Sequence, residues 1–364
     1  MKDSNKKKTK KKGRRLRKFL IGLGIFLAII GATAVWYTRH MHYDIEPHEF
    51  YDVETLQSEG RNYDKSSIVY MTNDISPEGL DKVYQALDVN PTGKVAIKLS
   101  TGEAGNPNHL DPKLIKNLVQ DVNGTIVECN TAYSGSKRAE TEMHMQVAKD
   151  HGFTDIADVD IMDRDGYMKI PVEGGKNLQE NWVGKNLANY DYVLVLTHFK
   201  GHPMAGFGGA LKNISIGIAS SEGKTRIHTG GTFSKPPIDF GSLVTNQDIF
   251  TESMAEAAKS VSDYEGNGQK IVYISVMNNM SIDCDCVSTP TAVDMHDIGI
   301  LASTDPVALD QACVDLVFRA KDGQSLQNRI LEKNGLHILT HSEEIGLGNR
   351  AYEIVNIDDG VGEN

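Results

Sequence analysis

The sequence predicts an α/β protein: a layered, mostly parallel sheet with flanking helices, preceded by one N-terminal transmembrane helix. Short apolar runs alternate with segments whose apolar residues recur at helical spacing, and this alternation predicts the sheet. Two of the runs, 192–197 and 271–277, are apolar enough to be buried on both faces, as strands of a parallel sheet are. An uncharged segment behind a block of lysine and arginine predicts the membrane helix.

The chain begins with a strongly basic segment. Residues 1–18 hold eleven lysine or arginine residues and one acid, a charge of +10. The net charge of the 364-residue chain is −11, so the remaining residues carry −21. An acidic body repels phosphates, which argues against nucleic acid as a partner. The basic segment itself predicts a cytoplasmic tail, because lysine and arginine beside a membrane helix stay on the cytoplasmic side.

The segment at 19–37 contains no charged side chain and has the length, about 20 residues, that crosses a bilayer. It predicts a single-pass anchor in the cell membrane, with the N-terminus in the cytoplasm and the main domain outside. A cleaved signal peptide is the alternative, since the Ala-Thr-Ala at 32–34 resembles a cleavage site. The polar residues 38–66 are expected to form a stalk or linker, and residues 67–360 an α/β domain.

The first half of the domain has the pattern of three strand–helix units. Strands are expected at 68–71, 94–99 and 125–129. Ser76 before Pro77 and Asp111 before Pro112 are N-cap signals for the first two helices, and a third helix is expected to end at Gly152.

The second half continues the alternation. Strands are expected at 192–197, 271–277 and 298–302, and Asp305 before Pro306 marks the start of another helix. In open α/β sheets, ligands bind at the carboxyl ends of the strands. The residues that directly follow these strands are therefore the candidates for chemistry.

The segment after 192–197 combines histidine, lysine and glycine. His198 and His202 are candidate metal ligands, although a pair of histidines is also common in a purely structural role. A glycine-rich loop follows, whose backbone N–H groups could hold a phosphate or carboxylate. Its spacing matches neither the P-loop nor the dinucleotide fingerprint. The residues expected to bind a cofactor or anion are Gly206, Gly208, Gly209, Lys212 and Asn213.

The segment after 271–277 contains Cys284-Asp285-Cys286, and three interpretations of it stay open. Thiolates select transition metals such as iron or zinc, a thiol pair can also cycle between redox states, and cysteine can be a small hydrophobe. A disulfide between residues so close would close a strained small ring. Two thiolates are too few for a closed zinc site, so His198 or His202 would supply further ligands.

The segment before the last of these strands contains Asp297, a candidate ligand or acid–base group. The motifs of serine hydrolases and zinc peptidases are absent. So is a four-cysteine cluster motif of ferredoxin type.

Seven stretches together resemble one protein family, the domain of unknown function 362 family, whose members are often labelled iron–sulfur centre proteins. The resemblance covers most of residues 68–357 and implies an α/β fold with a metal or cofactor site, but no reaction. The stretches are KLSTGEAGN (98–106), VECNTAYSGSKR (127–138), VEGGKNL (172–178), THFKGHPMAGFGGALKN (197–213), CDC (284–286), DIGILASTDPVALDQACVDL (297–316) and EEIGLGNRAYEIV (343–355).

This sequence departs from the family pattern in one respect. Many members carry a ferredoxin-like insert with four cysteines, whereas residues 222–265 here contain no cysteine. The family is also distantly similar to the nickel-pincer lactate racemases, which bind a lysine-tethered cofactor through histidines. That similarity makes Lys200, which lies between His198 and His202, a candidate catalytic residue.

Two hypotheses for the function follow, and whether the chain is an enzyme stays open between them. The first is a metal- or cofactor-dependent enzyme of redox or isomerase type outside the cytoplasmic membrane. The second is a protein without catalysis that binds an unknown small anion on the loop at 206–213. The membrane, through the N-terminal helix, is a partner in both.

Overall fold

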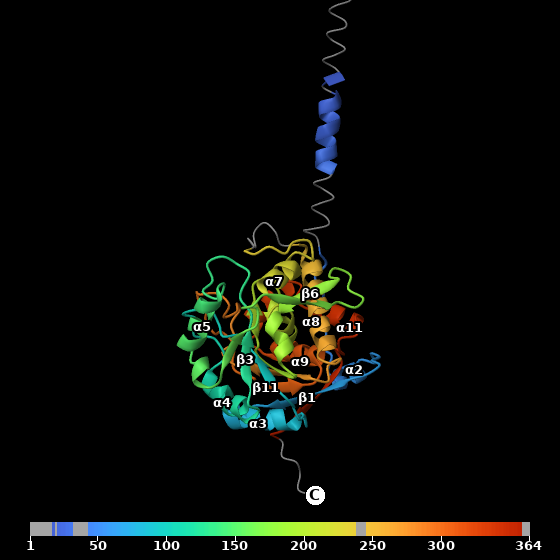
Figure 1. Cartoon of the computed structure of the whole chain (residues 1–364). Coiled ribbons are helices and arrows are strands. Elements are labelled where there is room, and N and C mark those ends of the chain that lie inside the picture. The colour runs from blue at the N-terminus through green and yellow to red at the C-terminus, as the bar shows by residue number, and fades with distance from the viewer. Residues whose placement is uncertain (1–16, 19, 32–42, 238–244, 359–364) are drawn as a thin grey trace, which may run out of the picture. The chain divides into compact units, whose positions relative to one another are not determined.

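The computed structural model describes residues 17–18, 20–31, 43–237 and 245–358 (Figure 1). Contacts divide the chain into two units, residues 1–44 and 45–364. In the first unit residues 20–31 are helical. Across the described ranges, no helix combines the length and the apolar character needed to cross a membrane. Part of the expected anchor, residues 19 and 32–37, lies outside the described residues.

The second unit is built on an eight-stranded sheet with the order β12-β1-β11-β10-β7-β2-β3-β4. Its strands pair in parallel except for β11, which is antiparallel to both of its neighbours. The mostly parallel α/β sheet is therefore confirmed. The strands are β1 (Ser67–Thr72), β2 (Val95–Lys98), β3 (Thr125–Glu128), β4 (Val159–Ile161), β7 (Tyr192–His198), β10 (Ile271–Met277), β11 (Gly299–Ser303) and β12 (Tyr352–Asn356).

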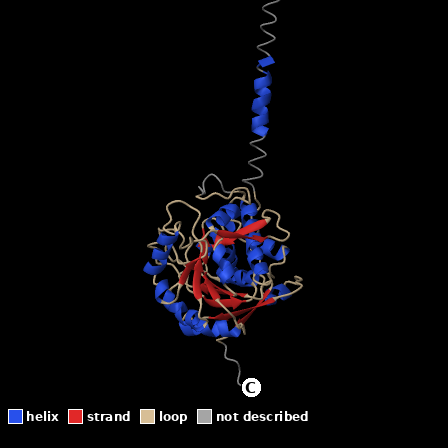
Figure 2. Ribbon diagram, in the orientation of Figure 1, coloured by secondary structure: helices blue, strands red, loops and turns tan. Residues whose placement is uncertain are grey.

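Helices cover both faces of this sheet, as Figure 2 shows. Two short 3-10 helices, η1 (Phe153–Asp155) and η2 (Lys185–Asn189), lie in the connections. The α-helices are α2 (Val53–Ser58), α3 (Pro77–Ala86), α4 (Pro112–Asp121), α5 (Thr141–Asp150), α6 (Ala210–Ser215), α7 (Ser221–His228), α8 (Gln247–Tyr264), α9 (Pro306–Arg319), α10 (Gln324–Glu332) and α11 (His337–Glu344).

The core lies on both sides of the sheet because successive residues of a strand face opposite sides. In β7, Val193 and Val195 pack with α6, α8, α9 and α11, whereas Leu194 and Leu196 pack with α3, α4 and α5. The continuous apolar runs of β7 and β10 are thus explained by burial on two faces.

The predicted helix starts are confirmed. Ser76 accepts a hydrogen bond from Gly79 N, Asp111 from Lys113 N, and Asp305 from Val307 N and Ala308 N. Each is followed by proline at the first helical position. These caps place the N-termini of α3, α4 and α9.

Two small antiparallel pairs supplement the sheet. One joins β5 (Tyr167–Pro171) and β6 (Glu180–Gly184). The other joins β8 (Lys200–His202) and β9 (Gly206–Gly208), which directly follow β7. The glycine-rich loop of the sequence is therefore a short hairpin that leads into α6.

Residues 45–66, part of the segment expected to be a stalk, belong to the second unit and lie against its helices. The Glu46 carboxylate is 2.5 Å from His337 Nδ1, and His48 Nε2 is 2.9 Å from Asp315 Oδ1. Arg319 on α9 pairs with Asp52 at 2.6 Å. Two acidic residues of this segment, Glu46 and Asp52, therefore have partners on α11 and α9.

Candidate functional site

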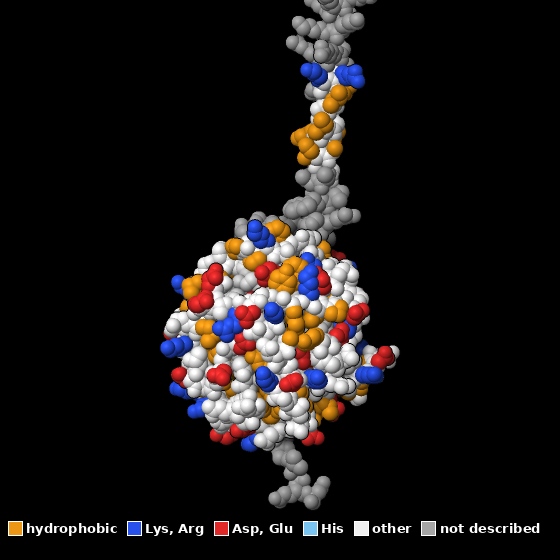
Figure 3. All heavy atoms as spheres, viewed as in Figure 1, with side chains coloured by type: hydrophobic (Ala, Val, Ile, Leu, Met, Phe, Trp, Pro, Cys, Tyr) orange, Lys and Arg blue, Asp and Glu red, His pale blue; other side chains and the backbone are white. Residues whose placement is uncertain are grey.

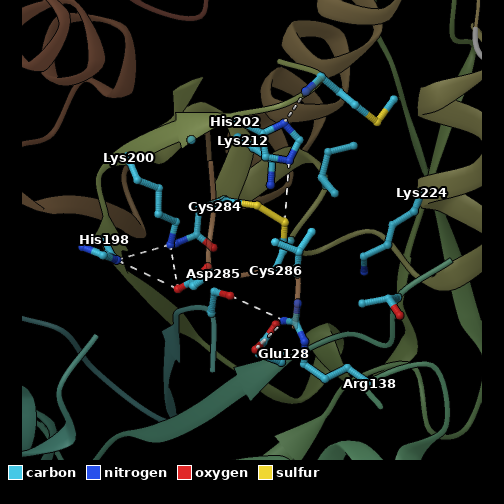
Figure 4. Close-up of a pocket in the computed structure, with 18 of the residues that line it drawn as sticks. Glu128, Arg138, His198, Lys200, His202, Lys212, Lys224, Cys284, Asp285 and Cys286 are labelled. Carbon is cyan, nitrogen blue, oxygen red and sulfur yellow. Dashed lines mark hydrogen bonds and ion pairs between the residues drawn. A yellow bond between two sulfur atoms is a disulfide. The ribbon is translucent and has the colours of Figure 1, made fainter. Parts of the chain in front are cut away.

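The carboxyl ends of four strands lie together at one edge of the sheet. β10, β7, β2 and β3 are consecutive and parallel, so the residues that follow them meet at the same side. There they enclose a cavity with a volume of about 270 Å³ (Figure 4). This is the position that the strand-end rule predicts for a ligand.

The cavity wall is strongly basic. Among the described residues that line it, five have cationic side chains and only two have carboxylates. The surface in Figure 3 differs, because acidic and basic side chains are interspersed on the face it shows. The face in Figure 3 therefore lacks the excess of positive charge that the cavity wall has. The cationic residues are Lys98, Arg138, Lys200, Lys212 and Lys224, and the acids are Glu128 and Asp285.

Glu128, at the end of β3, is the counter-ion of two cationic residues of the cavity wall, Lys98 and Arg138. Its carboxylate lies 4.0 Å from Lys98 Nζ and 3.6 Å from Arg138 Nη1, and it accepts a 2.8 Å hydrogen bond from the Thr101 hydroxyl. Burial alone would raise the pKa of Glu128, but Lys98, His144 and Arg138 hold it well below its ordinary value. Burial also lowers the pKa of Lys98 to about 8.

Lys200 on β8 has its own counter-ion. Its ammonium lies 2.8 Å from Asp285 Oδ2 and 3.5 Å from His198 Nδ1. The other ring nitrogen of His198, Nε2, donates a 2.6 Å hydrogen bond to the carbonyl of Asn278. His198 therefore orients its acceptor nitrogen toward Lys200, and both of its ring nitrogens have partners.

Lys212 on α6 differs from the other lysines of the cavity. Lys98 donates to Asn213 Oδ1 at 2.9 Å, Lys200 pairs with Asp285, and Lys224 donates to the Ala219 carbonyl at 2.5 Å. For Lys212 Nζ, the described part of the chain offers no hydrogen-bond acceptor or ion-pair partner. Burial, together with Lys200, Arg138 and Lys98, lowers the pKa of Lys212 to about 7. An anion in the cavity would supply the missing counter-charge.

Lys212 and Asn213 are positioned by a buried aspartate from α9. Asp310 Oδ1 accepts from Ala210 N at 2.7 Å, and its Oδ2 accepts from Leu211 N at 2.9 Å, at the first turn of α6. Gly209 is needed beside it, because a Cβ at that position would lie 2.3 Å from Asp310 Oδ1. Asn213 then bridges β2 and β7, because its Oδ1 accepts from Lys98 Nζ of β2 at 2.9 Å and its Nδ2 donates to the Thr197 hydroxyl of β7 at 3.0 Å.

His202 presents an N–H group to the cavity. Its Nδ1 accepts hydrogen bonds from Met204 N at 3.2 Å and Ala205 N at 3.0 Å, so the proton of the neutral ring lies on Nε2. Burial and the neighbouring cations, Lys212 first among them, hold the pKa of His202 well below its ordinary value. The protonated nitrogen, Nε2, lies 3.9 Å from Cys286 Sγ.

Cys284 and Cys286 form a disulfide in the cavity wall. The sequence left metal binding, redox cycling and simple packing open for this pair. The sulfurs bond to each other in this structure, despite the strain expected for so small a ring. Their loop is clamped by its neighbours, since Tyr133 donates to the Cys286 carbonyl at 2.5 Å, and Glu103 N to the Asp285 carbonyl at 2.7 Å.

A cluster of three residues whose types can ligate metals is nevertheless present. Among the described residues, the ligand atoms of His202, Cys284 and Cys286 all lie within 4.8 Å of one another. The donor chemistry does not fit a metal in this form, because bonded sulfurs are not thiolates. His202 Nε2 also carries the proton while Nδ1 accepts two backbone N–H groups. His198, the fourth predicted ligand, is not in the cluster.

The structure brings most of the predicted site residues together. Lys200, Gly208, Gly209, Lys212 and Asn213 line the cavity with the two histidines and the two cysteines. Gly206, in β9, does not line it. Asp297 is exposed, accepts a hydrogen bond from Asn279 N and does not line the cavity.

Several site residues could not be selected by the sequence reasoning. Their signal was a charged residue at the end of an otherwise apolar run, as in the strands that end at Lys98 and Glu128. A buried strand does not keep such a charge without a partner. Lys98 and Glu128 are the two strand-end residues that this signal could have identified. The other cavity residues that were not predicted lie in loops and helices: Arg138, Lys224, His228 and Asp285.

Comparison with known proteins places the chain in a family. A family model described as a domain of unknown function, DUF362, matches residues 95–315. No curated protein matches. The lactate racemase apoprotein from Thermoanaerobacterium thermosaccharolyticum matches at 18% identity over 57% of this chain and 50% of its own, with a TM-score of 0.34. A protein from Thermotoga maritima matches at 14% identity over 67% of this chain and 58% of its own, with a TM-score of 0.39.

The chain thus spans about half the length of the solved structures it matches. The family model, in contrast, covers more than half of this chain and includes β2, β3, β7 and β10, whose ends build the cavity. The protein belongs to the DUF362 family.

Proposed function

We propose that the cavity binds an anionic small molecule, a substrate or an organic cofactor that carries carboxylate or phosphate groups. The observation that carries this proposal is the unpaired Lys212 ammonium in a wall with five cations and two acids. Lys212 is partly buried, and withdrawing a positive charge from water without a counter-ion is costly. A bound anion reduces that cost. Lys212, Lys224 and Arg138 would hold the anionic groups, while the Nε2–H of His202 donates a further hydrogen bond.

Thermal shift of the full chain in detergent tests this proposal. The ligands are sulfate, pyrophosphate, a sugar phosphate and a dicarboxylate, with a neutral polyol as the uncharged reference. At least one anion should raise the melting temperature and the polyol should not, since only a ligand that binds the folded state stabilises it. Lys212→Met should abolish the rise. Lys169→Met is the matched control, because Lys169 is an exposed lysine paired with Glu180 on the β5–β6 hairpin. No response to any anion would overturn the proposal.

A second candidate is the binding of iron or zinc, which the grouping of His202, Cys284 and Cys286 favours. It requires the disulfide to be reduced first, because thiolates are the ligands that these metals select. Elemental analysis of the chain reduced without oxygen tests it. About one metal ion per chain, lost from Cys284→Ser/Cys286→Ser, would support this candidate. Absence of metal from the reduced wild-type chain would remove it.

The location proposed for this function is the outer side of the cell membrane. The support is the uncharged run at 19–37 behind a segment with a charge of +10. Protease added to intact cells would digest an outward-facing domain and leave one that faces the cytoplasm untouched.

A further inference from the structure

We propose that Cys284 and Cys286 form a thiol–disulfide exchange site, which oxidises an anionic thiol bound in the basic cavity. This inference rests on the proposed binding of anions and names a chemical class of substrate for it. The disulfide is part of the cavity wall, so a ligand held by Lys212 would lie against it. Figure 4 shows the pair between His202 and Lys212 on one side and Asp285 on the other.

The two cysteines differ in exposure. The Cys284 residue is 2% exposed, whereas Cys286 is partly exposed. Disulfide exchange requires a thiolate to approach one sulfur from outside. Cys286 Sγ is therefore the sulfur that an incoming thiolate attacks, and Cys284 Sγ is the leaving group of that first step.

The surroundings stabilise the reduced pair. Thiolates are favoured by nearby cations, and a dithiol stabilised in this way makes its disulfide a stronger oxidant. Lys212 provides a cation whose charge no described residue neutralises. His202 Nε2–H, 3.9 Å from Cys286 Sγ, can donate to a thiolate formed there. Asp285 lies between the cysteines in sequence, but its charge is balanced by Lys200 at 2.8 Å.

The remaining cysteines do not compete for this chemistry. Cys129 and Cys313 are buried and free. Burial raises the pKa of each thiol well above its ordinary value, which keeps both protonated and unreactive. The clamps from Tyr133 and Glu103 hold the loop of Cys284 and Cys286 in place. The two sulfurs accordingly stay next to each other when their bond opens.

The reaction balances in two exchange steps. A substrate thiolate attacks Cys286 Sγ, a bond forms between the two sulfurs, and the bond to Cys284 breaks with its electron pair on Cys284. A second substrate thiolate then attacks the substrate sulfur of this mixed disulfide. The bond to Cys286 breaks, the electron pair stays on Cys286, and a substrate disulfide leaves. Two electrons have moved to the cysteine pair, and an external small-molecule disulfide restores the starting state by the reverse steps.

The experiment measures how fast the full chain reacts with three thiols of different charge in the absence of oxygen. Glutathione is the anionic probe, 2-mercaptoethanol the neutral one and cysteamine the cationic one, each compared at equal thiolate concentration. Alkylation and intact-mass measurement follow the loss of the disulfide. Glutathione should react at least about tenfold faster than the other two, and added salt should reduce that preference. Lys212→Met should reduce the preference while the chain stays folded.

The Cys284→Ser variant locates the step. Oxidised glutathione should form a mixed disulfide at its Cys286, which mass spectrometry of the digested protein identifies. Equal rates for the three thiols, or reduction only in urea, would overturn the proposal. The Cys284→Ser/Cys286→Ser variant separates this failure from that of anion binding. If anions still raise its melting temperature while the wild-type chain shows no exchange, the cavity binds anions and the redox inference alone is wrong.

Discussion

The Lys200 ammonium lies 2.8 Å from the Asp285 carboxylate, and both side chains are less than a tenth exposed. This pair joins the β8–β9 hairpin to the loop that carries the disulfide. Burial alone would raise the pKa of Asp285, but the Lys200 ammonium holds it below its ordinary value. The Asp285 carboxylate is therefore ionised, and each member of the pair depends on the other to stay buried.

Lys200→Met should lower the free energy of unfolding by about 3–5 kcal/mol, because it leaves a buried carboxylate without its cation. Asp285→Asn should also be destabilising, and the double variant should lose less than the sum of the two single changes. Urea unfolding of residues 45–364, which form one contact unit, measures all three. Strictly additive losses would show that the two charges do not interact.

Anion affinity should fall as the pH rises through about 7, because Lys212 loses its proton there. Sulfate is a suitable probe, since its charge is constant over this range. Lys98, whose pKa is about 8, should lower the anion affinity further at higher pH, because it also loses its proton. Lys212→Arg should remove the step near pH 7, as guanidinium stays charged. An unchanged step in this variant would assign the titration to another group.

The same pKa has the opposite effect on the stability of the protein without ligand. Between about 7 and the ordinary lysine value of 10.5, the unfolded chain binds the proton that folded Lys212 has released. The contribution of Lys212 to the free energy of unfolding therefore becomes more favourable to the folded state as the pH rises across that window. Comparison of wild type with Lys212→Met by urea unfolding at several pH values isolates this contribution.

Asp310→Ala should destabilise the fold by about 1–3 kcal/mol and weaken anion binding as well. The change removes the acceptor for two backbone N–H groups at the start of α6, the helix that carries Lys212. Asp310→Asn keeps an acceptor oxygen and should cost less. Thermal melts with and without sulfate report both effects. Normal sulfate binding by a folded Asp310→Ala chain would contradict the role given to this cap.

Gly201→Ala should displace the disulfide loop, because a Cβ there would lie 2.0 Å from the carbonyl oxygen of Ile282. Gly208→Ala in the same hairpin is a matched control, since its Cβ would meet atoms no closer than 3.7 Å. The first variant should lose about 1–3 kcal/mol of stability and the second much less. Similar losses of stability in the two variants would mean that any alanine in the hairpin is destabilising, and that the contact of Gly201 with Ile282 has no special role.

The sequence was sufficient for the architecture because local signals and the global fold agree in this chain. N-caps at Ser76, Asp111 and Asp305 fixed helix starts, and apolar runs fixed the central strands. The strand-end rule also located the site. The charges within it were harder to predict, since Glu128 and Lys98 meet only after β3 has paired with β2. Pairing of Cys284 with Cys286 likewise depends on a loop held by residues far away in sequence.

The most direct test of the basic cavity is a crystal of residues 45–364 soaked in sodium tungstate, a tetrahedral anion that anomalous scattering locates. An anomalous peak is expected inside the cavity, within hydrogen-bond distance of Lys212 Nζ, and it should be missing from Lys212→Met crystals. Tungstate bound only at surface lysines, with an empty cavity in the wild-type crystal, would contradict it.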